Sequence, residues 1–177
     1  MLPLPFRWFL LAFLPTFLLT LLHRIVRTAA VTFTVFSFHG VPERYITEGD
    51  VYLEHCSRTA WLLAERLGLA RVEWEMVFQS RFGDEPWLQP YADEFVPALA
   101  TSHPVVQIVM PAFVSDCLET LEEIGIRLRD DFLGAGGQQL IVTPALNADD
   151  DWADCVAGLA DGTPEPVSAP TSSHPEP

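Results

Sequence analysis

Apolar residues in the central part of the chain fall into short β-branched runs separated by longer stretches with helical periodicity. The apolar runs predict four strands, at Val31–Phe38, Val72–Phe78, Val105–Met110 and Leu140–Val142. The periodic stretches predict four helices, at Tyr52–Leu67, Ala92–Leu99, Ser115–Leu133 and Trp152–Leu159. Strict alternation of strand and helix is typical of an α/β fold, here a four-stranded parallel sheet with helices on both faces.

Composition limits the partners and the compartment. Ten basic against twenty-four acidic residues give a formal net charge of −14, which argues against a nucleic-acid partner. The three cysteines, Cys56, Cys117 and Cys155, form no CxxC motif and are typical of free thiols in a reducing, cytoplasmic location. Three cysteines are also too few for an iron–sulfur cluster, which normally takes four.

Polar phrases stand where three of the predicted strands end. They are Ser37-Phe38-His39-Gly40, then Gln79-Ser80-Arg81-Phe82-Gly83 with Trp87-Leu88-Gln89-Pro90-Tyr91 after it, then Asp116-Cys117-Leu118-Glu119-Thr120-Leu121-Glu122-Glu123. The carboxyl ends of parallel strands meet at one edge of a sheet, so we expect the phrases to converge there. His39 can accept a proton or bind a metal near pH 7, and its alternative is a loop histidine bonded to nearby backbone.

In order and spacing, these phrases resemble the C-terminal half of ferrochelatase, from about Val31 to about Leu159. The resemblance implies a single flavodoxin-like, chelatase-type half and insertion of Fe²⁺ into protoporphyrin IX in haem biosynthesis. Iron would be a substrate, with no cofactor retained. Nothing in the chain resembles the family's N-terminal half, which supplies the opposing lip of the porphyrin site in relatives. We therefore expect impaired activity from the lone chain.

The resemblance also implies roles for individual residues. His39 and Glu119 would be catalytic and face one another across the porphyrin. Metal contacts would come from His39, Glu119 and Glu123. The cleft around the porphyrin would be lined by Tyr45, Ser80, Arg81 and Trp87, with Arg81 suited to a propionate.

Structural alternatives exist for several of these residues. Glu119 could form a capping box with Asp116 at the start of its helix. Some relatives carry an acid at the position of Arg127. Because this chain has a basic residue there, Glu123 could instead form a surface ion pair with Arg127. Arg81 could be ion-paired within its own loop, and Trp87 could belong to the core.

The ends of the chain differ from the domain predicted at residues 29–161. Residues 1–28 contain an apolar stretch, Trp8–Leu22, whose fifteen residues would span about 22 Å as a helix, short of the roughly 30 Å of a bilayer core. Three interpretations remain open: a membrane-associated or signal-like segment, a replacement for the missing half, or a reading-frame artefact. Residues 162–177 are rich in proline and are predicted to be disordered.

Three other functions remain open as well. The chain could be a non-catalytic truncated half, a chelatase for another pair of tetrapyrrole and metal, or a small membrane-anchored haem-binding module. A peripheral membrane contact would accompany the last of these and would draw on residues 1–28.

Overall fold

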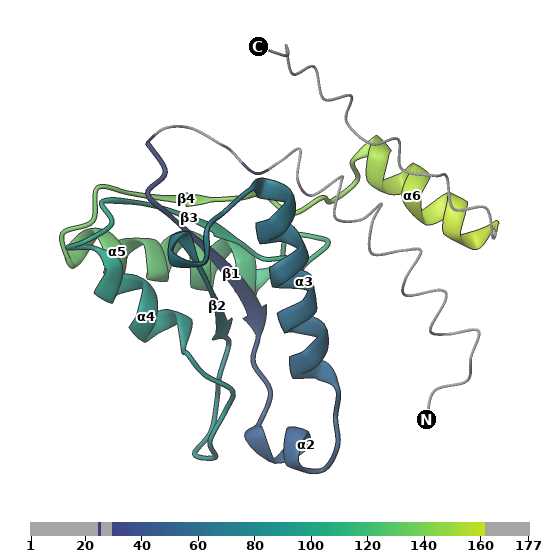
Figure 1. The fold of residues 1–177 in the computed structure, drawn as a ribbon, viewed down its shortest axis with the longest axis horizontal. Coiled ribbons are helices and arrows are strands. Elements are labelled where there is room, and N and C mark those ends of the chain that lie inside the picture. The colour runs from purple at the N-terminus through teal and green to yellow at the C-terminus, as the bar shows by residue number, and fades with distance from the viewer. Residues whose placement is uncertain (1–24, 26–29, 162–177) are drawn as a thin grey trace, which may run out of the picture.

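The computed structural model describes residue 25 and residues 30–161, in which strands and helices alternate (Figure 1). In chain order the elements are β1 (Phe33–His39), α2 (Glu43–Thr47), α3 (Tyr52–Leu67), the 3-10 helix η1 (Arg71–Glu73), β2 (Trp74–Gln79), α4 (Ala92–Leu99), β3 (Val105–Val109), the π-helix η2 (Glu119–Leu128), α5 (Arg129–Gly134), β4 (Gln139–Val142) and α6 (Asp150–Ala160). The four predicted strands are confirmed, and helices occupy all four regions predicted to be helical.

The four strands run parallel in one sheet, in the order β2-β1-β3-β4. Six of the seven residues of β1 are buried, which explains why its apolar run is continuous rather than alternating. In the register of the sheet His39 stands beside Gln79, and Phe36 stands beside Val109. The carboxyl ends of β1, β2 and β3 therefore lie at the same edge, and the predicted α/β fold with a four-stranded parallel sheet is confirmed.

Helices cover both faces of this sheet, as predicted. Figure 1 shows α3 on one side of the strands and α4 with α5 on the other. The core under α3 includes the buried residues Phe36, Phe38, Ala60, Leu63 and Phe78. The core on the opposite face includes the buried residues Val35, Val77, Val96, Ile108, Ile124 and Phe132. The sheet is thus enclosed between two apolar layers, and polar side chains inside its strands, such as Ser37, Gln79 and Gln107, are buried with hydrogen-bond partners.

The start of β2 differs from the sequence prediction. The strand begins at Trp74 rather than at Val72, because Arg71–Glu73 form a 3-10 turn. The carboxylate of Glu73 accepts a hydrogen bond of 2.7 Å from the backbone N–H of Ala70, which stabilises that turn. The single-turn helix α2 was not predicted, and none of its five residues is buried to give a hydrophobic period.

The longest predicted helix has a different geometry from that expected. Within the predicted range, Glu119–Leu128 form the π-helix η2, and an α-helix, α5, continues to Gly134. Buried residues recur at every fourth position along it, at Thr120, Ile124, Leu128 and Phe132. A strict four-residue spacing suits a helix wider than the 3.6 residues per turn of an α-helix. Glu119 and Glu123, also four apart, consequently lie about one turn from each other on the same side.

The predicted segment 1–28 and the tail 162–177 lie outside the described residues, with the exception of Ile25. The Ile25 side chain is 7% exposed and belongs to the core under α3. The interpretations of Trp8–Leu22 and of the tail, and the boundaries between the three regions, stay predictions. Within residue 25 and residues 30–161, no helix has the length and apolarity needed to cross a bilayer.

Candidate active site at the carboxyl edge of the sheet

His39 is the last residue of β1 and is half-buried. Its Nδ1 lies 2.7 Å from the carbonyl oxygen of Gly40. A carbonyl oxygen can only accept, so Nδ1 carries the hydrogen, and in the neutral ring the lone pair then resides on Nε2. The hydroxyl of Tyr52 donates a bond of 2.8 Å to the backbone carbonyl of His39, which fixes this strand end to α3. The backbone thus leaves Nε2 as the atom able to accept a proton or bind a metal.

Two aromatic rings flank the imidazole of His39. The ring centroids of Trp87 and Phe113 lie 6.3 Å and 6.4 Å from that of His39. Trp87 is 4% exposed, so it belongs to the core, and its indole N–H has no hydrogen-bond partner among the described residues. Gly40 allows this packing, because a Cβ there would lie 3.0 Å from Cε3 of Trp87. The imidazole of His39 therefore packs against apolar aromatic rings.

Glu119 is the first residue of η2 and is partly exposed. Its carboxyl pKa is lowered, first by a hydrogen bond from the Cys117 side chain, then by its own backbone N–H, and further by the charge of His39. The backbone carbonyl of Glu119 accepts a hydrogen bond of 3.1 Å from the side chain of Gln79, and Gln79 stands beside His39 in the register of β1 and β2. The structure therefore brings both predicted catalytic residues to the same edge of the sheet.

Glu123 lies one turn further along η2 and contacts the end of β2. Its carboxylate accepts bonds from the backbone N–H of Ser80 at 2.7 Å and from the Ser80 hydroxyl at 2.6 Å. Ser80 has φ +65°, in the left-handed region that is unfavourable for a residue with a Cβ. Among the described residues, no three His, Cys, Asp or Glu side chains come together as a metal site. The metal contacts expected of His39, Glu119 and Glu123 stay predictions.

Two structural alternatives considered for this helix are wrong. The capping box does not form, because the backbone N–H of Asp116 donates to the side-chain oxygen of Asn147 rather than to Glu119. The surface ion pair involves Glu122 instead of Glu123: the Arg127 guanidinium lies 2.8 Å from the Glu122 carboxylate. Because Ser80 contacts Glu123, that carboxylate faces the sheet edge rather than solvent.

Arg81 has carboxylate partners within the protein. One terminal nitrogen of its guanidinium lies 2.9 Å from Asp93 and 2.8 Å from Glu94, both in the first turn of α4. The guanidinium also lies over the ring of Tyr91, 3.8 Å from its centroid. The alternative of an ion-paired Arg81 is therefore what the structure contains, and a ligand propionate would have to compete with these two carboxylates.

Tyr45 lies on α2, in the segment that follows His39. It is 37% exposed, and the Arg44 guanidinium stacks 4.4 Å from its ring centroid. Arg44 is also ion-paired with Glu85, at 2.9 Å, in the segment that precedes Trp87. Tyr45 is thus a surface residue beside the predicted cleft, and its contact with a ligand stays a prediction.

The sequence reasoning assigned no role to Gln79 or to Ser37. Gln79 is 3% exposed, and its side-chain amide donates to the backbone carbonyl of Glu119 at 3.1 Å. The Ser37 hydroxyl is fully buried and donates to the oxygen of that amide at 2.7 Å. Both are polar residues inside apolar strand runs next to the candidate site. Because a buried polar group needs a hydrogen-bond partner, this pattern in the sequence indicates that both side chains bind a neighbouring element.

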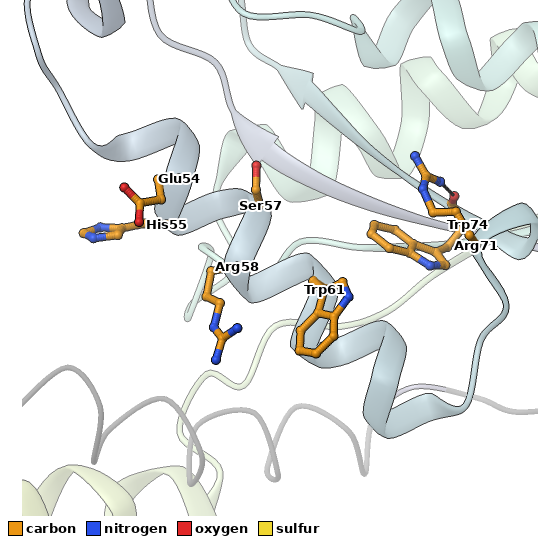
Figure 2. Close-up of a pocket in the computed structure, with 7 residues that line it drawn as sticks. All are labelled: Glu54, His55, Ser57, Arg58, Trp61, Arg71 and Trp74. Atoms are coloured by element: carbon orange, nitrogen blue, oxygen red, sulfur yellow. Dashed lines mark hydrogen bonds between the residues drawn. The ribbon is translucent and has the colours of Figure 1, made fainter.

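A surface hollow adjoins these residues, and a larger one lies elsewhere on the described part of the chain. A hollow of about 330 Å³ lies beside η2 and is lined by Gln79, Ser80, Glu123 and neighbouring side chains. A larger one of about 760 Å³ lies between α3 and the start of β2, where Trp61 and Trp74 contribute to its wall (Figure 2). Trp74 pairs with Thr34 near the start of the strands. The wall of the larger hollow at Trp74 therefore lies at the opposite end of the strands from His39.

Known proteins similar to this chain agree with the motif-based resemblance. The family model described as ferrochelatase matches residues 14–163. A ferrochelatase of Actinobacillus pleuropneumoniae serotype 5b is 49% identical over 126 residues, which are 71% of this chain and 40% of that relative. A ferrochelatase of Aeromonas hydrophila is 54% identical over 114 residues, which are 64% of this chain and 35% of the relative. A coproporphyrin III ferrochelatase of Streptococcus mutans is 50% identical over 115 residues, covering 64% of this chain and 36% of the relative. The chain thus spans well under half the length of these proteins, and it belongs to the ferrochelatase family.

Proposed function

We propose that the carboxyl edge of the sheet is one wall of a site that inserts ferrous iron into protoporphyrin IX in haem biosynthesis. In this reaction Fe²⁺ forms bonds to the ring nitrogens while two pyrrole N–H groups lose their protons, so the site must accept protons beside an incoming cation. The observation that carries the proposal is the hydrogen bond from His39 Nδ1 to the Gly40 carbonyl. In the neutral imidazole that bond leaves the lone pair on Nε2, as a general base requires.

Glu119 supplies the second group that this chemistry needs. Its lowered pKa keeps the carboxylate ionised at neutral pH, and the cause is mainly the hydrogen bond from the Cys117 side chain. An ionised carboxylate beside the imidazole can take the second pyrrole proton or pass a proton on to solvent. Its negative charge also favours the approach of Fe²⁺ to this edge.

Exposed apolar side chains near this edge suit a flat apolar macrocycle. Phe82 is 74% exposed and Leu118, which precedes Glu119, is 71% exposed. The ring of Phe82 lies 5.0 Å from that of Trp87, which in turn flanks His39. An apolar surface next to a few polar groups is the usual composition of a small-molecule site.

A second wall is part of the proposal. The matched region is 40% of the length of the Actinobacillus relative, and we attribute the opposing wall to a segment like the rest of that protein. Insertion requires a stiff ring to be held and distorted against the metal, and positioning of this kind contributes roughly 7–11 kcal/mol to catalysis. The chain on its own should consequently metallate porphyrin very slowly.

The experiment combines the purified chain with the separately expressed, unmatched part of the Actinobacillus ferrochelatase. Anaerobic loss of protoporphyrin fluorescence on addition of Fe²⁺ reports insertion. We expect little insertion by either part and measurable turnover by the mixture. If the two parts form a complex by size-exclusion chromatography and the complex still fails to insert iron, the proposal is wrong.

Coproporphyrin III is a second candidate substrate, favoured by the similarity of the chain to the coproporphyrin III ferrochelatase of Streptococcus mutans. It carries four carboxylates where protoporphyrin IX carries two, so its recognition needs more cationic partners. At the described edge Arg81 is already ion-paired with Asp93 and Glu94, which favours the less charged porphyrin. The ratio of kcat/KM for the two porphyrins in the reconstituted mixture decides between them, and the same assay with Co²⁺ or Zn²⁺ reports metal preference.

A further inference from the structure

We propose that Gln79 is a positioning residue that holds the first turn of η2, and Glu119 with it, beside His39. The catalytic meaning of this inference rests on the proposed function, whereas the positioning itself is a property of the fold. Gln79 and His39 are neighbours in the register of β1 and β2. The side chain of Gln79 reaches from that point to the backbone of Glu119. A single buried residue therefore links the two predicted catalytic groups.

A hydrogen bond from Ser37 on β1 fixes the orientation of the Gln79 side-chain amide. The Ser37 hydroxyl, 0% exposed, donates to the Gln79 side-chain oxygen at 2.7 Å. With the oxygen occupied by this donor, the NH₂ group must point away from β1 and toward η2. It donates there to the Glu119 carbonyl at 3.1 Å and approaches the Glu123 carboxylate at 3.5 Å. The network is directional and is not a chance contact of a flexible side chain.

The contact falls where the helix changes geometry. At the start of η2 the backbone N–H of Leu121 donates to the Cys117 carbonyl at 2.9 Å, which is the i to i−4 pattern of an α-turn. Within a π-helix the pattern becomes i to i−5, and Glu119 is the first residue of this π-helix. The side chain of Gln79 is a donor to the Glu119 carbonyl at this position. Its loss should therefore loosen the start of η2 rather than the whole domain.

The test compares Gln79→Met with Gln107→Met in the full chain. Each change replaces a buried amide by an unbranched side chain of similar length, and Gln107 on β3 donates to the Thr143 hydroxyl at 2.9 Å, at the opposite side of β1 from β2. Amide hydrogen exchange is measured over residues 119–128, and urea unfolding gives the change in global stability. One lost hydrogen bond corresponds to an acceleration of about five- to tenfold.

For Gln79→Met we expect amide exchange in residues 119–128 to be about five- to tenfold faster than the change in global stability alone would cause. For Gln107→Met we expect exchange in the same residues to follow global stability alone. A shift of the Glu119 carbonyl ¹³C resonance in the first variant, and not in the second, is the accompanying signature. Equal behaviour of the two variants in η2, or an unshifted Glu119 resonance, overturns the inference.

Ser37→Ala keeps the test valid should Gln79→Met fail to fold. It removes only the donor that orients the Gln79 amide, so it should accelerate amide exchange in residues 119–128 by about two- to fivefold. No acceleration there, or an equal acceleration throughout the chain, overturns the inference. The reconstituted mixture adds a functional readout, in which Gln79→Met should lower kcat at least fivefold with the porphyrin KM unchanged. A wild-type mixture that does not insert iron contradicts the proposed function only, because exchange decides the positioning by itself.

Discussion

The carboxylate of Glu123 accepts two hydrogen bonds from Ser80, one from its backbone N–H at 2.7 Å and one from its hydroxyl at 2.6 Å. Bonds to an ionised acceptor are stronger than neutral ones, about 1.5–3 kcal/mol each. They offset the unfavourable backbone of Ser80, whose φ of +65° costs on the order of 1–3 kcal/mol in a residue with a Cβ. Glu123 therefore connects the end of β2 to η2. This structural role is additional to its predicted contact with metal.

Substitutions of Ser80 should separate the hydroxyl from the backbone strain. Ser80→Ala loses the hydroxyl bond and keeps the strain, so we expect unfolding free energy to fall by about 1–2 kcal/mol. Ser80→Gly loses the same bond and relieves the strain, so it should be less destabilised than the alanine variant. Urea unfolding measures both, and a glycine variant less stable than the alanine variant would contradict the account.

Gly40 should not tolerate a side chain. A Cβ there would lie 3.0 Å from Cε3 of Trp87 and 3.1 Å from the Gln79 carbonyl oxygen, and the second neighbour is backbone that cannot move freely. We expect Gly40→Ala to cost about 1–3 kcal/mol, as overpacked cores do. The matched control is Gly134→Ala at the end of α5, where a Cβ meets nothing within 4 Å. Equal urea midpoints for the two variants would contradict the prediction.

The fold was predictable because both signals that define it are local. β-branched runs such as Val105–Val109 mark buried strands, and Gly68, with φ +64°, ends α3 where the sequence indicated. The π-helical geometry of η2 was not predicted, because a spacing of three to four residues between apolar positions is also typical of an α-helix. The four-residue recurrence of Thr120, Ile124 and Leu128 is the feature of the sequence that fits the wider winding.

The candidate site was only partly predictable. His39 follows from its place at a strand end and Glu119 from the family resemblance, and the structure brings them to one edge. The partners of Glu123 and Arg127 depend on how far η2 is wound, which spacing alone does not fix. The same holds for Gln79, whose role becomes clear only once β2 and η2 are adjacent.

The cysteines should differ in their reactivity with alkylating agents. Burial raises the pKa of the Cys56 thiol to about 11, and burial also raises the pKa of Cys155. Cys117 is only half-buried, at the start of the helix that carries Glu119. Because the thiolate is the reactive form, iodoacetamide at pH 8 should modify Cys117 first. Peptide mass spectrometry over time measures this order, and faster labelling of Cys56 would contradict it.

The pH dependence of Glu119 should follow its lowered pKa. A carboxyl whose pKa is lower in the folded chain stabilises the fold above the unfolded pKa, and this contribution is lost as pH falls through the folded value. The main cause is the hydrogen bond from Cys117, so Cys117→Ala should raise the pKa of Glu119 toward the ordinary value of about 4.3. Cys117→Ser retains a donor and should change it less. Carboxyl ¹³C titration by NMR measures all three proteins, and an unchanged pKa in Cys117→Ala would contradict the assigned cause.

His39→Ala should abolish iron insertion in the mixture of this chain with the complementary part of a relative. The substitution removes the proposed base, whose lone pair is set by its bond to Gly40, and loss of a general base costs roughly 10²–10⁴-fold in rate. Glu122→Ala is the matched control on η2, because Glu122 is ion-paired with Arg127 at the surface, where such pairs contribute about 0.2–1 kcal/mol to stability. Its rate of porphyrin fluorescence loss should stay within about twofold of the unmodified chain. Circular dichroism and porphyrin binding must match among the three proteins for the comparison to hold. If His39→Ala retains the unmodified rate, the base lies elsewhere, and Glu119→Gln in the same assay identifies whether the carboxylate serves instead.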